Sequence, residues 1–323
     1  ITFFSEFAGA LILFIRFSFS YGLCFKSFFH SLFHSISAFC NAGFALYSDS
    51  MIGFKSDVFV NLTICFLIIL GGLSFSVITN VYENLRNFIN IRILKKRNAF
   101  TKLSLNTIVV LSITSILIFT GTLLFYGFEH GNILLKENIF TQYLASFFQS
   151  ITLRTAGFNT LDISNLNGYT YFFMIIFMFI GGASGSTAGG VKVNSVGVIF
   201  AYFRSFLNNS GETTLLKKSI SHETITKSFL AVTLGGVLIF LATIILSASE
   251  KFSTTQILFE IVSAFGTVGL STGITPNLSY LGKIVIIILM FVGKVGPLTI
   301  LASVSKKAEN SSIKYPEATI TIG

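Results

Sequence analysis

The sequence predicts an all-α integral membrane protein built from a repeated unit. Its composition, its apolar runs and an internal repeat support this fold class. Hydrophobic residues make up 52% of the 323 residues, charged residues make up 11%, and the mean hydropathy is +0.79. Soluble domains usually carry about 25% charged residues. The cysteines, Cys24, Cys40 and Cys65, have neither the spacing of metal ligands nor an even number, so we interpret them as packing residues.

Long apolar runs alternate with short ones along the chain. A helix that spans a bilayer needs about 20 predominantly apolar residues. Six stretches reach or approach this length, the fourth with a glycine-rich break: residues 1–20, 58–78, 103–126, 169–206, 225–248 and 281–304. Shorter apolar runs occupy residues 28–39, 140–151 and 254–265. Because these runs are too short to span, we predict re-entrant half-helices, which are tolerated where they line a water-filled cavity.

Each short run is followed by a variant of one tetrapeptide, and its three glycines are spaced by 114 and then 112 residues. Potassium channels coordinate ions with the backbone carbonyls of Thr-Val-Gly-Tyr-Gly loops, and glycine adopts the backbone angles that such loops need. A single glycine here would be an ordinary helix end, but three copies between predicted spans indicate an ion-selectivity filter. The copies read Asn41-Ala42-Gly43-Phe44, Thr155-Ala156-Gly157-Phe158 and Thr267-Val268-Gly269-Leu270.

The segments around these glycines resemble the Trk/Ktr/HKT superfamily of potassium transporters, and within it the KtrB-like subunits. The matching segments are residues 34–39, 41–44, 154–159, 181–190 and 266–271, and the resemblance extends over essentially the whole chain. It implies units of outer helix, pore half-helix, filter and inner helix around one central pore. It also implies a homodimer with a pore in each protomer, which docks on a cytosolic nucleotide-binding regulatory ring.

The resemblance implies four such units, of which the sequence contains three. We place them at residues 1–85 (the family's second unit), 103–206 (the third) and 225–305 (the fourth), followed by a cytoplasmic tail at 306–323. The family's first filter has no counterpart here. We therefore expect an N-terminally truncated sequence, and a truncated, non-conducting membrane subunit is the alternative to a working pore.

Basic residues predict the orientation in the membrane. The segments that flank the filters (21–57, 128–169 and 250–283) carry six Lys and Arg in total, whereas the opposite segments (86–102, 204–227 and 306–314) carry thirteen. Because cytoplasmic loops carry the excess of Lys and Arg, we expect the filters to face outward from a cytoplasmic (inner) membrane. Most of the net charge of +9 is this excess. No basic–aromatic pattern accompanies it, so nucleic acid is not an expected partner.

Two features predict a gate. Residues 181–190 read Gly-Gly-Ala-Ser-Gly-Ser-Thr-Ala-Gly-Gly, which cannot sustain a regular lipid-facing helix. In the family, the matching loop lies beneath the filter and blocks the pore. A charge within the last span, Lys294, marks a functional site by default. The family usually has Arg there, and Lys lacks its planar fork. A close-packed helix interface and a lysine that snorkels to the surface are the alternatives.

Other ionisable residues support weaker interpretations. His30 and His34 lie four residues apart, but no third ligand is near in the sequence, so we interpret them as packing residues at the rim of the pore. Arg154 precedes a filter and is expected to brace it from behind, paired with Glu260. Cys40 stands where the family usually has Asn, immediately before the first visible filter.

These observations predict potassium uptake, with potassium as the transported ion and membrane lipid around the protein. No catalytic constellation indicates an enzyme. Glycine in every visible filter, rather than the serine of the sodium-preferring plant branch, favours potassium, while a channel and a sodium-coupled transporter both remain open. The predicted ion-binding residues are Asn41, Ala42, Gly43, Thr155, Ala156, Gly157, Thr267, Val268 and Gly269. The predicted gating residues are Gly181, Gly182, Ser184, Gly185, Ser186, Thr187, Gly189, Gly190 and Lys294.

Overall fold

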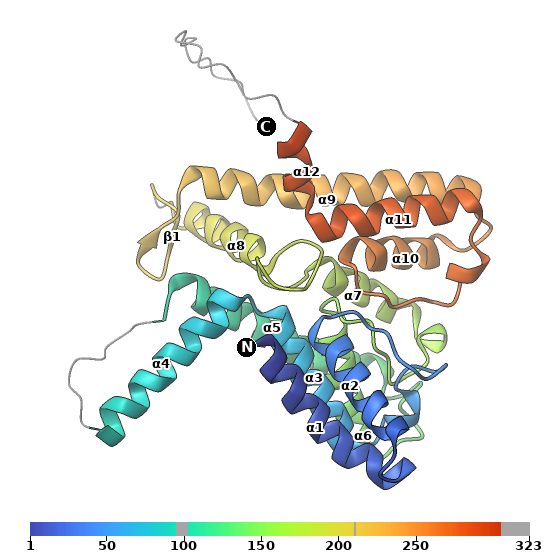
Figure 1. The fold of residues 1–323 in the computed structure, drawn as a ribbon. Coiled ribbons are helices and arrows are strands. Elements are labelled where there is room, and N and C mark those ends of the chain that lie inside the picture. Colours follow the sequence, from blue (N-terminus) through green and yellow to red (C-terminus); the bar gives the residue numbers. More distant parts are fainter. Residues whose placement is uncertain (95–102, 210, 305–323) are drawn as a thin grey trace.

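The computed structural model describes residues 1–94, 103–209 and 211–304, most of which form helices (Figure 1). One plan occurs three times: a long outer helix, a short pore helix, a loop and an inner helix. We name these repeats units A, B and C in chain order. The all-α fold class is confirmed. The expected tail at 306–323 lies outside the described residues.

The elements of the three units are as follows. Unit A contains α1 (Thr2–Tyr21), α2 (Phe25–Phe39), η1 (Ile52–Phe54), α3 (Val58–Gly72) and α4 (Phe75–Leu94). Unit B contains α5 (Leu105–Glu129), α6 (Ile139–Thr152), η2 (Ile163–Asn165), α7 (Gly168–Phe179) and α8 (Val193–Leu207). An antiparallel hairpin of β1 (Thr214–Leu215) and β2 (Lys218–Ser219) leads to unit C, with Thr214 opposite Ser219. Unit C contains α9 (His222–Ser249), α10 (Thr254–Gly266), η3 (Thr275–Asn277), α11 (Tyr280–Val295) and α12 (Pro297–Val304).

The pore helices α2, α6 and α10 lie where the three short apolar runs predicted half-helices. Polar side chains fix where two of them begin, because they satisfy backbone N–H groups that a helix start leaves free. Asn138 accepts the N–H of Thr141 at the start of α6. Ser253 and Gln256 form a reciprocal capping box at the start of α10. These short helices therefore begin at polar residues and end at the filter loops.

The outer helices carry the apolar surface. Among the described residues, α1, α5 and α9 are each long and apolar enough to cross a membrane. Large side chains on α1 stay exposed, and Phe3 and Phe19 are 88% and 80% accessible. The core forms around the pore helices instead, with Phe148 and Phe265 fully buried. Aromatic and aliphatic side chains exposed on the outer helices are suited to contact with lipid tails, which are equally apolar.

Carboxylates tie the outer helix to the inner helix in units B and C. Glu129, at the end of α5, is fully buried and accepts hydrogen bonds from the hydroxyl of Thr170 and from the N–H of Asn167, the latter at 2.9 Å. Glu250, which follows α9, accepts the hydroxyl of Ser279 at 2.5 Å. In both units the acid satisfies the start of the inner helix, where the helix dipole also favours negative charge.

Unit A forms two ion pairs. The Nε of Arg16 lies 2.5 Å from Oδ2 of Asp57, the residue that caps α3. Lys55 forms a second pair with Glu137 of unit B, again at 2.5 Å. The first pair joins α1 to the start of α3 within unit A, and the second pair connects units A and B.

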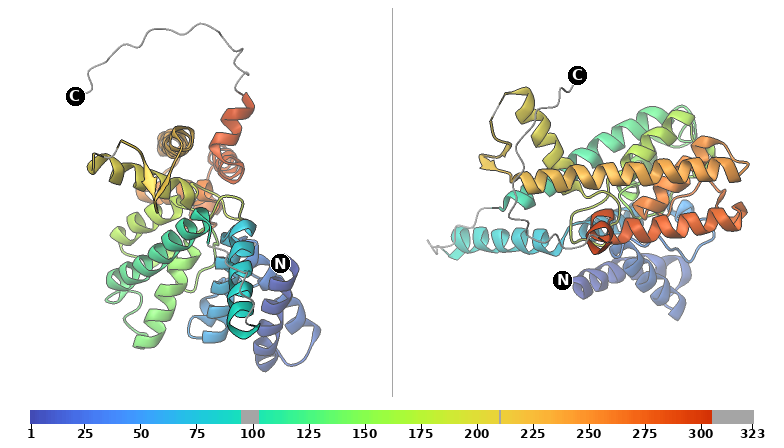
Figure 2. Two further views of the ribbon diagram at one scale, coloured as in Figure 1. Left: turned by 90° about the vertical axis from the view of Figure 1, so that its left-hand side faces the viewer. Right: turned by 90° about the horizontal axis from the view of Figure 1, so that it is seen from above.

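Each of the three inner helices is interrupted. The predicted break within 169–206 is confirmed, since α7 ends at Phe179 and α8 begins at Val193. The continuous spans predicted at 58–78 and 281–304 are wrong: α3 and α4 meet at a bend of 106°, and α11 ends before Gly296. In Figures 1 and 2, α4 extends away from the other helices of unit A as a result.

Close backbone contacts explain where two of these breaks occur. A Cβ atom at Gly71 would collide with the carbonyl oxygen of Phe39, and one at Gly293 would collide with that of Phe265. Phe39 and Phe265 stand at the ends of pore helices α2 and α10. Glycine is required because only its backbone can approach the ends of these helices so closely.

Candidate ion pathway

The loops that follow the pore helices meet at one place in the molecule. We refer to the three repeated tetrapeptides as candidate filters A, B and C, in chain order. A Cβ atom at Gly43 would collide with the carbonyl oxygen of Ala156, and a Cβ atom at Gly157 would collide with that of Val268. A Cβ atom at Gly269 would lie 3.7 Å from Cα of Gly157. The filter glycines predicted from the sequence are therefore brought side by side.

The sign of the backbone angle φ alternates along each candidate filter. In each filter, φ is positive at the first residue and at the glycine. The values are 50° at Asn41 and 72° at Gly43, 69° at Thr155 and 86° at Gly157, and 52° at Thr267 and 92° at Gly269. Left-handed residues at alternate positions allow successive carbonyls to face one side, which is the arrangement that ion coordination by backbone oxygens needs. Non-glycine residues with positive φ are uncommon and are often found at functional sites.

A hydroxyl in the last turns of each pore helix braces the following filter. The side-chain hydroxyl donates to the carbonyl of the residue that follows the filter glycine. The carbonyl of the same Ser or Thr accepts the N–H of the residue that precedes the glycine. The hydroxyl bonds are Ser37 to Phe44 at 2.8 Å, Thr152 to Phe158 at 2.5 Å and Ser263 to Leu270 at 2.6 Å. The N–H bonds are Ala42 to Ser37 at 2.9 Å, Ala156 to Thr152 at 3.0 Å and Val268 to Ser263 at 2.8 Å.

These hydroxyl residues were missed by the sequence analysis. Ser37 and Ser263 precede their glycine by six residues, whereas Thr152 precedes its glycine by five. An alignment on the glycines therefore displaces Thr152 by one position and conceals the repeat. The available signal was a Ser or Thr near the end of each short apolar run. We name these three residues the hydroxyl braces.

Residues one turn earlier in the pore helices anchor the chain beyond the filter. In unit A, Nε2 of His34 accepts the N–H of Leu46 at 3.2 Å. In unit C, Glu260 accepts the N–H of Thr272 at 2.9 Å and the hydroxyl of Thr275 at 2.8 Å. His34 is therefore engaged in the protein, and within the described residues no group of three His, Cys, Asp or Glu side chains could hold a metal.

Unit B differs at this position. Gln149 is fully buried, and neither its amide nitrogen nor its amide oxygen has a hydrogen-bond partner among the described residues; the hydroxyl of Thr160 is also unpaired. Arg154 is buried without the expected ion pair to Glu260, whose carboxylate is instead engaged by the loop of its own unit. The predicted pairing is wrong because hydroxyl and N–H donors already surround Glu260.

A cavity of about 400 Å³ lies between candidate filters A and C. Its lining includes Asn41 and Ala42 from one filter and Thr267 and Val268 from the other, and it reaches Lys294 on α11. The cavity therefore connects residues predicted to bind ions with the residue predicted to close the pathway.

The glycine-rich segment between α7 and α8 forms a loop at the centre of the molecule, visible between these helices in Figure 1. Units A and C hold it from two sides. The N–H of Thr187 donates to the carbonyl of Gly71 at 3.2 Å, and the N–H of Gly190 donates to that of Gly293, also at 3.2 Å. We call residues 181–190 the central loop. It lies against the broken ends of the neighbouring inner helices.

Lys294 contacts the central loop directly. Its ammonium donates a hydrogen bond to the carbonyl oxygen of Thr187, 107 residues away. Lys294 lines the cavity between filters A and C, and it also lines a second cavity of about 530 Å³, whose walls include Ser184 and Gly190 of the central loop. The predicted gating elements are therefore in contact, and Lys294 borders both cavities.

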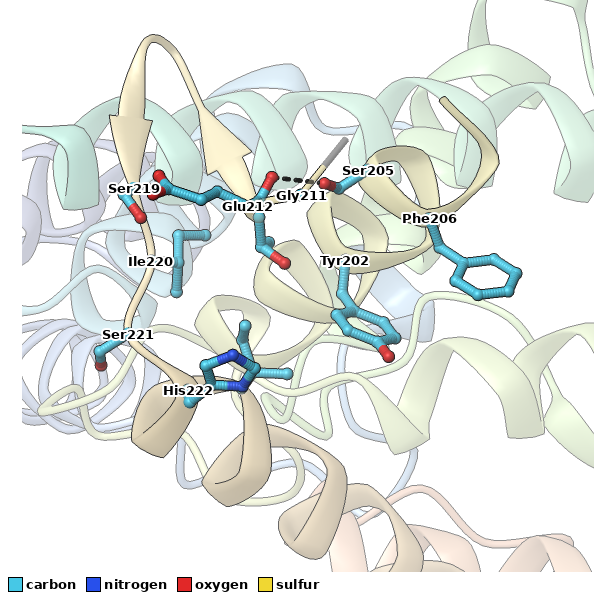
Figure 3. Close-up of a pocket in the computed structure, with 11 residues that line it drawn as sticks. Tyr202, Ser205, Phe206, Gly211, Glu212, Ser219, Ile220, Ser221 and His222 are labelled. Atoms are coloured by element: carbon cyan, nitrogen blue, oxygen red, sulfur yellow. Dashed lines mark hydrogen bonds between the residues drawn. The ribbon is translucent and has the colours of Figure 1, made fainter. Parts of the chain in front are cut away.

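A further cavity, of about 440 Å³, lies apart from the filters, where the β-hairpin meets α8 and the start of α9 (Figure 3). Tyr202 and His222 line it, and the hydroxyl of Ser205 donates to the carbonyl of Glu212 at 2.6 Å beside it. Nothing in the sequence analysis indicated this cavity, because its walls come from residues with no recognisable motif.

Three short helices that end at converging backbone loops, with a glycine-rich loop packed against the broken inner helices, form an arrangement typical of pore-type cation transport proteins. The chain belongs to the TrkH family, described as cation transport protein, which it matches over residues 1–315. Within this family it is a KtrB-like member of the Trk/Ktr superfamily.

Individual relatives agree with this assignment. The chain is 40% identical to Ktr system potassium uptake protein B of Vibrio alginolyticus over 297 residues, which is 91% of this chain and 63% of the relative. It is 38% identical to the protein of the same name from Bacillus subtilis, over 98% of this chain and 68% of the relative. It is 34% identical to potassium/sodium uptake protein NtpJ of Enterococcus hirae, over 98% of this chain and 68% of the relative. The chain thus spans about two thirds of the length of these proteins.

A solved structure shows the same fold. The potassium transporter TrkH from Vibrio parahaemolyticus superimposes with a TM-score of 0.72 at 17% sequence identity, over 93% of this chain and 61% of that chain. The likeness supports the membrane transporter fold of the described helices.

Proposed function

We propose that this chain lines the ion pathway of a potassium uptake protein. The observation that carries the proposal is the convergence of the three candidate filters, with the same alternation of backbone hand in each. Backbone carbonyls that face one axis replace the water shell of a potassium ion. The printed names of the Vibrio and Bacillus relatives, potassium uptake proteins, favour the same cargo.

The proposed coordination uses main-chain oxygens of the nine predicted ion-binding residues. Two of these residues, Thr155 and Ala156, are fully buried, so their side chains are not exposed to a passing ion. The hydroxyl braces hold the filters from behind and leave the coordinating carbonyls free. Rigid placement matters because selection between ions of similar size depends on the number and field strength of the coordinating carbonyls.

The proposed gate consists of the central loop and Lys294. Lys294 supports this proposal, because it lines both the cavity next to the filters and the cavity bordered by the loop, and its ammonium donates to the carbonyl of Thr187 in the loop. A fixed positive charge on the pathway opposes a cation. Release of Thr187 would move the loop and the charge together.

The proposal also covers the orientation of the protein in the membrane, its partner proteins and the ion to which uptake is coupled. The filters face outward from the cytoplasmic membrane, and the basic hairpin with Lys217 and Lys218 faces the cytoplasm, in keeping with the excess of basic residues on that side. A homodimer and a cytosolic nucleotide-binding ring are the proposed partners. The name of the Enterococcus relative, potassium/sodium uptake protein, supports a test for sodium as a coupling ion.

A non-conducting membrane subunit is the alternative, and one observation favours it. Gly43 and Gly157 each have a neighbouring filter carbonyl within collision distance of a Cβ atom, but for Gly269 the nearest atom is Cα of Gly157 at 3.7 Å. Among the described residues, contacts between filters therefore run from A through B to C without closing into a ring.

Rubidium uptake in cells that lack their own potassium uptake systems separates the two functions. We expect the protein, expressed with its regulatory partner, to restore growth at low potassium and to take up rubidium. The variant Gly157→Ala should abolish both while reaching the membrane in equal amount. Uptake that is absent from the unaltered protein, at normal membrane abundance and with the partner present, would favour the non-conducting subunit.

A further inference from the structure

Helix α4 leaves the bundle at a sharp angle. It follows the inner helix α3 after only two residues, and the two helices meet at 106°. Helix α4 contains 20 residues and is therefore about 30 Å long. Its start is fixed in the protein, because Val77 is fully buried in a cluster with Val110 and Val193. Beyond this first turn, α4 projects away from the neighbouring helices (Figures 1 and 2).

A hydrogen bond places the first half of α4 beside the start of an outer helix. Oδ1 of Asn80 accepts the N–H of Ser104 at 2.9 Å. Ser104 is the residue that caps α5, which is long and apolar enough to cross a membrane. A helix that crosses a bilayer begins near the bilayer surface. Since α4 turns by 106° from α3 at this level, its axis points along the membrane surface more than into the membrane.

The large apolar side chains of α4 gather on one face. Successive residues of an α-helix turn by about 100°, so residues three, four and seven positions apart share a face. Residues with this spacing remain between 44% and 62% exposed, and we call them the apolar stripe: Tyr82, Leu85, Phe88 and Ile89. Asn80 and the exposed Glu83 lie on the polar face. Because Asn80 is bonded to Ser104, the apolar stripe is turned away from the capped end of α5.

The apolar stripe continues a surface that already suits lipid. Phe75 lies seven residues before Tyr82 on the same line of α4 and is exposed, as are Leu62 and Phe66 on α3. A helix with one apolar and one polar face lies in the membrane interface, with its apolar face buried about 5–10 Å into the boundary of headgroups and acyl chains. Arg86 borders the stripe and is exposed, as suits a long side chain whose stem lies on apolar surface and whose charge stays in water.

We propose that α4 is an interfacial helix, which binds the lipid surface of the membrane through the apolar stripe. The partner is the bilayer itself, not a second copy of the chain and not a soluble protein. The segment 86–102, which begins within α4, carries six Lys and Arg, so the leaflet is the one that faces the predicted cytoplasmic side. The inference concerns the placement of α4 in the membrane and does not depend on the transport function.

Tryptophan fluorescence tests this placement, because the 323 residues contain no tryptophan. We would reconstitute the protein in liposomes of phosphatidylethanolamine and phosphatidylglycerol, with Tyr82→Trp as the reporter in the stripe and the unaltered protein as background. Lipids brominated on their acyl chains should quench the reporter, whereas aqueous iodide should quench it weakly. Bromines near the headgroup end should quench more strongly than bromines near the chain end, as expected for a side chain about 5–10 Å deep.

Glu83→Trp is the matched control, because Glu83 is the next residue along the helix and lies on its polar face. Iodide should quench Glu83→Trp severalfold more strongly than Tyr82→Trp, and brominated lipid should quench it severalfold less. Ile89→Trp provides a second reporter in the stripe if Tyr82→Trp does not fold. Leu85→Glu, added to Ile89→Trp, should remove most of the quenching by brominated lipid, because a charged side chain opposes insertion.

Other results would overturn the inference. A Tyr82→Trp reporter that is shielded from both quenchers would mean that protein covers the stripe, as in a dimer or a complex with a regulatory partner. Equal quenching of Tyr82→Trp and Glu83→Trp by iodide would place α4 in water. Strongest quenching by bromines near the chain end would place α4 in the core of the bilayer. Rubidium flux into the same liposomes reports separately on transport, so the placement of α4 and the transport function are judged independently.

Discussion

The hydroxyl of Thr152 lies 2.5 Å from the carbonyl oxygen of Phe158 and thereby joins the end of a pore helix to the residue after a filter glycine. Equivalent bonds occur in the other two units. The end of each pore helix and the candidate filter that follows it therefore form one hydrogen-bonded structure, and the geometry of the loop depends on a side chain in the helix before it.

Removal of a hydroxyl brace should reduce the selectivity between ions more than it reduces the amount of protein in the membrane. We expect Thr152→Val to reduce the preference for rubidium over sodium by up to about tenfold, since one hydrogen bond contributes about 0.5–1.5 kcal/mol and 1.4 kcal/mol is a factor of ten. Competition of sodium with rubidium uptake measures this preference. Ser31→Ala is the control, because Ser31 is a buried pore-helix residue whose hydroxyl donates, within the described part of the chain, to the carbonyl of Ser27 in its own helix. A preference equally changed in both variants contradicts a specific role of the brace.

Filter glycines should not tolerate a side chain. Gly157 has a φ of 86°, and its Cβ position overlaps the carbonyl oxygen of Val268. Gly157→Ala should therefore lower uptake by more than about tenfold, since both backbone strain and displacement of a neighbouring filter follow. Gly168→Ala is the matched control, because nothing lies within 4 Å of its Cβ position at the start of α7. Normal uptake by Gly157→Ala would refute the close contact of filters B and C.

Substitutions at two equivalent pore-helix positions, Glu260 and Gln149, should differ in their effect on thermal stability. Glu260→Gln weakens a carboxylate that accepts bonds from Thr272 and Thr275, and bonds to a charged group are worth about 1.5–3 kcal/mol each. Gln149→Leu removes a buried amide without a described partner. We expect thermal unfolding in detergent at a clearly lower temperature for Glu260→Gln than for Gln149→Leu. Equal losses would indicate that Gln149 has a partner of its own.

The two ion pairs of unit A should contribute unequally. The carboxylate of Asp57 is only 9% accessible in its pair with Arg16, whereas Lys55 and Glu137 are 38% and 21% accessible. Loss of Arg16 leaves a nearly buried charge unpaired, which is costly, while partly exposed pairs contribute about 0–1 kcal/mol. Arg16→Ala should therefore lower the unfolding temperature more than Lys55→Ala does. The reverse order would show that the link between units A and B dominates.

Much of the fold followed from local patterns. The pore helices were predicted to within a few residues from the short apolar runs that precede the repeated glycines, and in the structure capping residues such as Asn138 and Ser253 mark where two of these helices begin. The break after Phe179 was predicted because the following decapeptide is rich in glycine. The breaks near Gly72 and Gly296 were not, because the surrounding sequence stays apolar and glycine is common in membrane helices.

The contacts of the candidate pathway depended on tertiary structure. The residues of the three candidate filters were predicted from their spacing, and the central loop was predicted from its glycine content, but the hydroxyl braces were not predicted. A Ser or Thr near a helix end has many possible partners, and only the folded backbone selects one. The predicted pair of Arg154 and Glu260 was wrong for the same reason, since the prediction ignored the hydroxyl residues that follow the third filter.

The three candidate filters come from one polypeptide and are not copies of each other: the first position is Asn in one and Thr in two, and the middle position is Ala in two and Val in one. In a pore assembled from identical subunits, every substitution is repeated around the axis and its effect is multiplied. In the pathway proposed here, a substitution alters a single side. Properties such as ion preference can therefore be adjusted in small increments during evolution, and an experimenter can do the same one filter at a time.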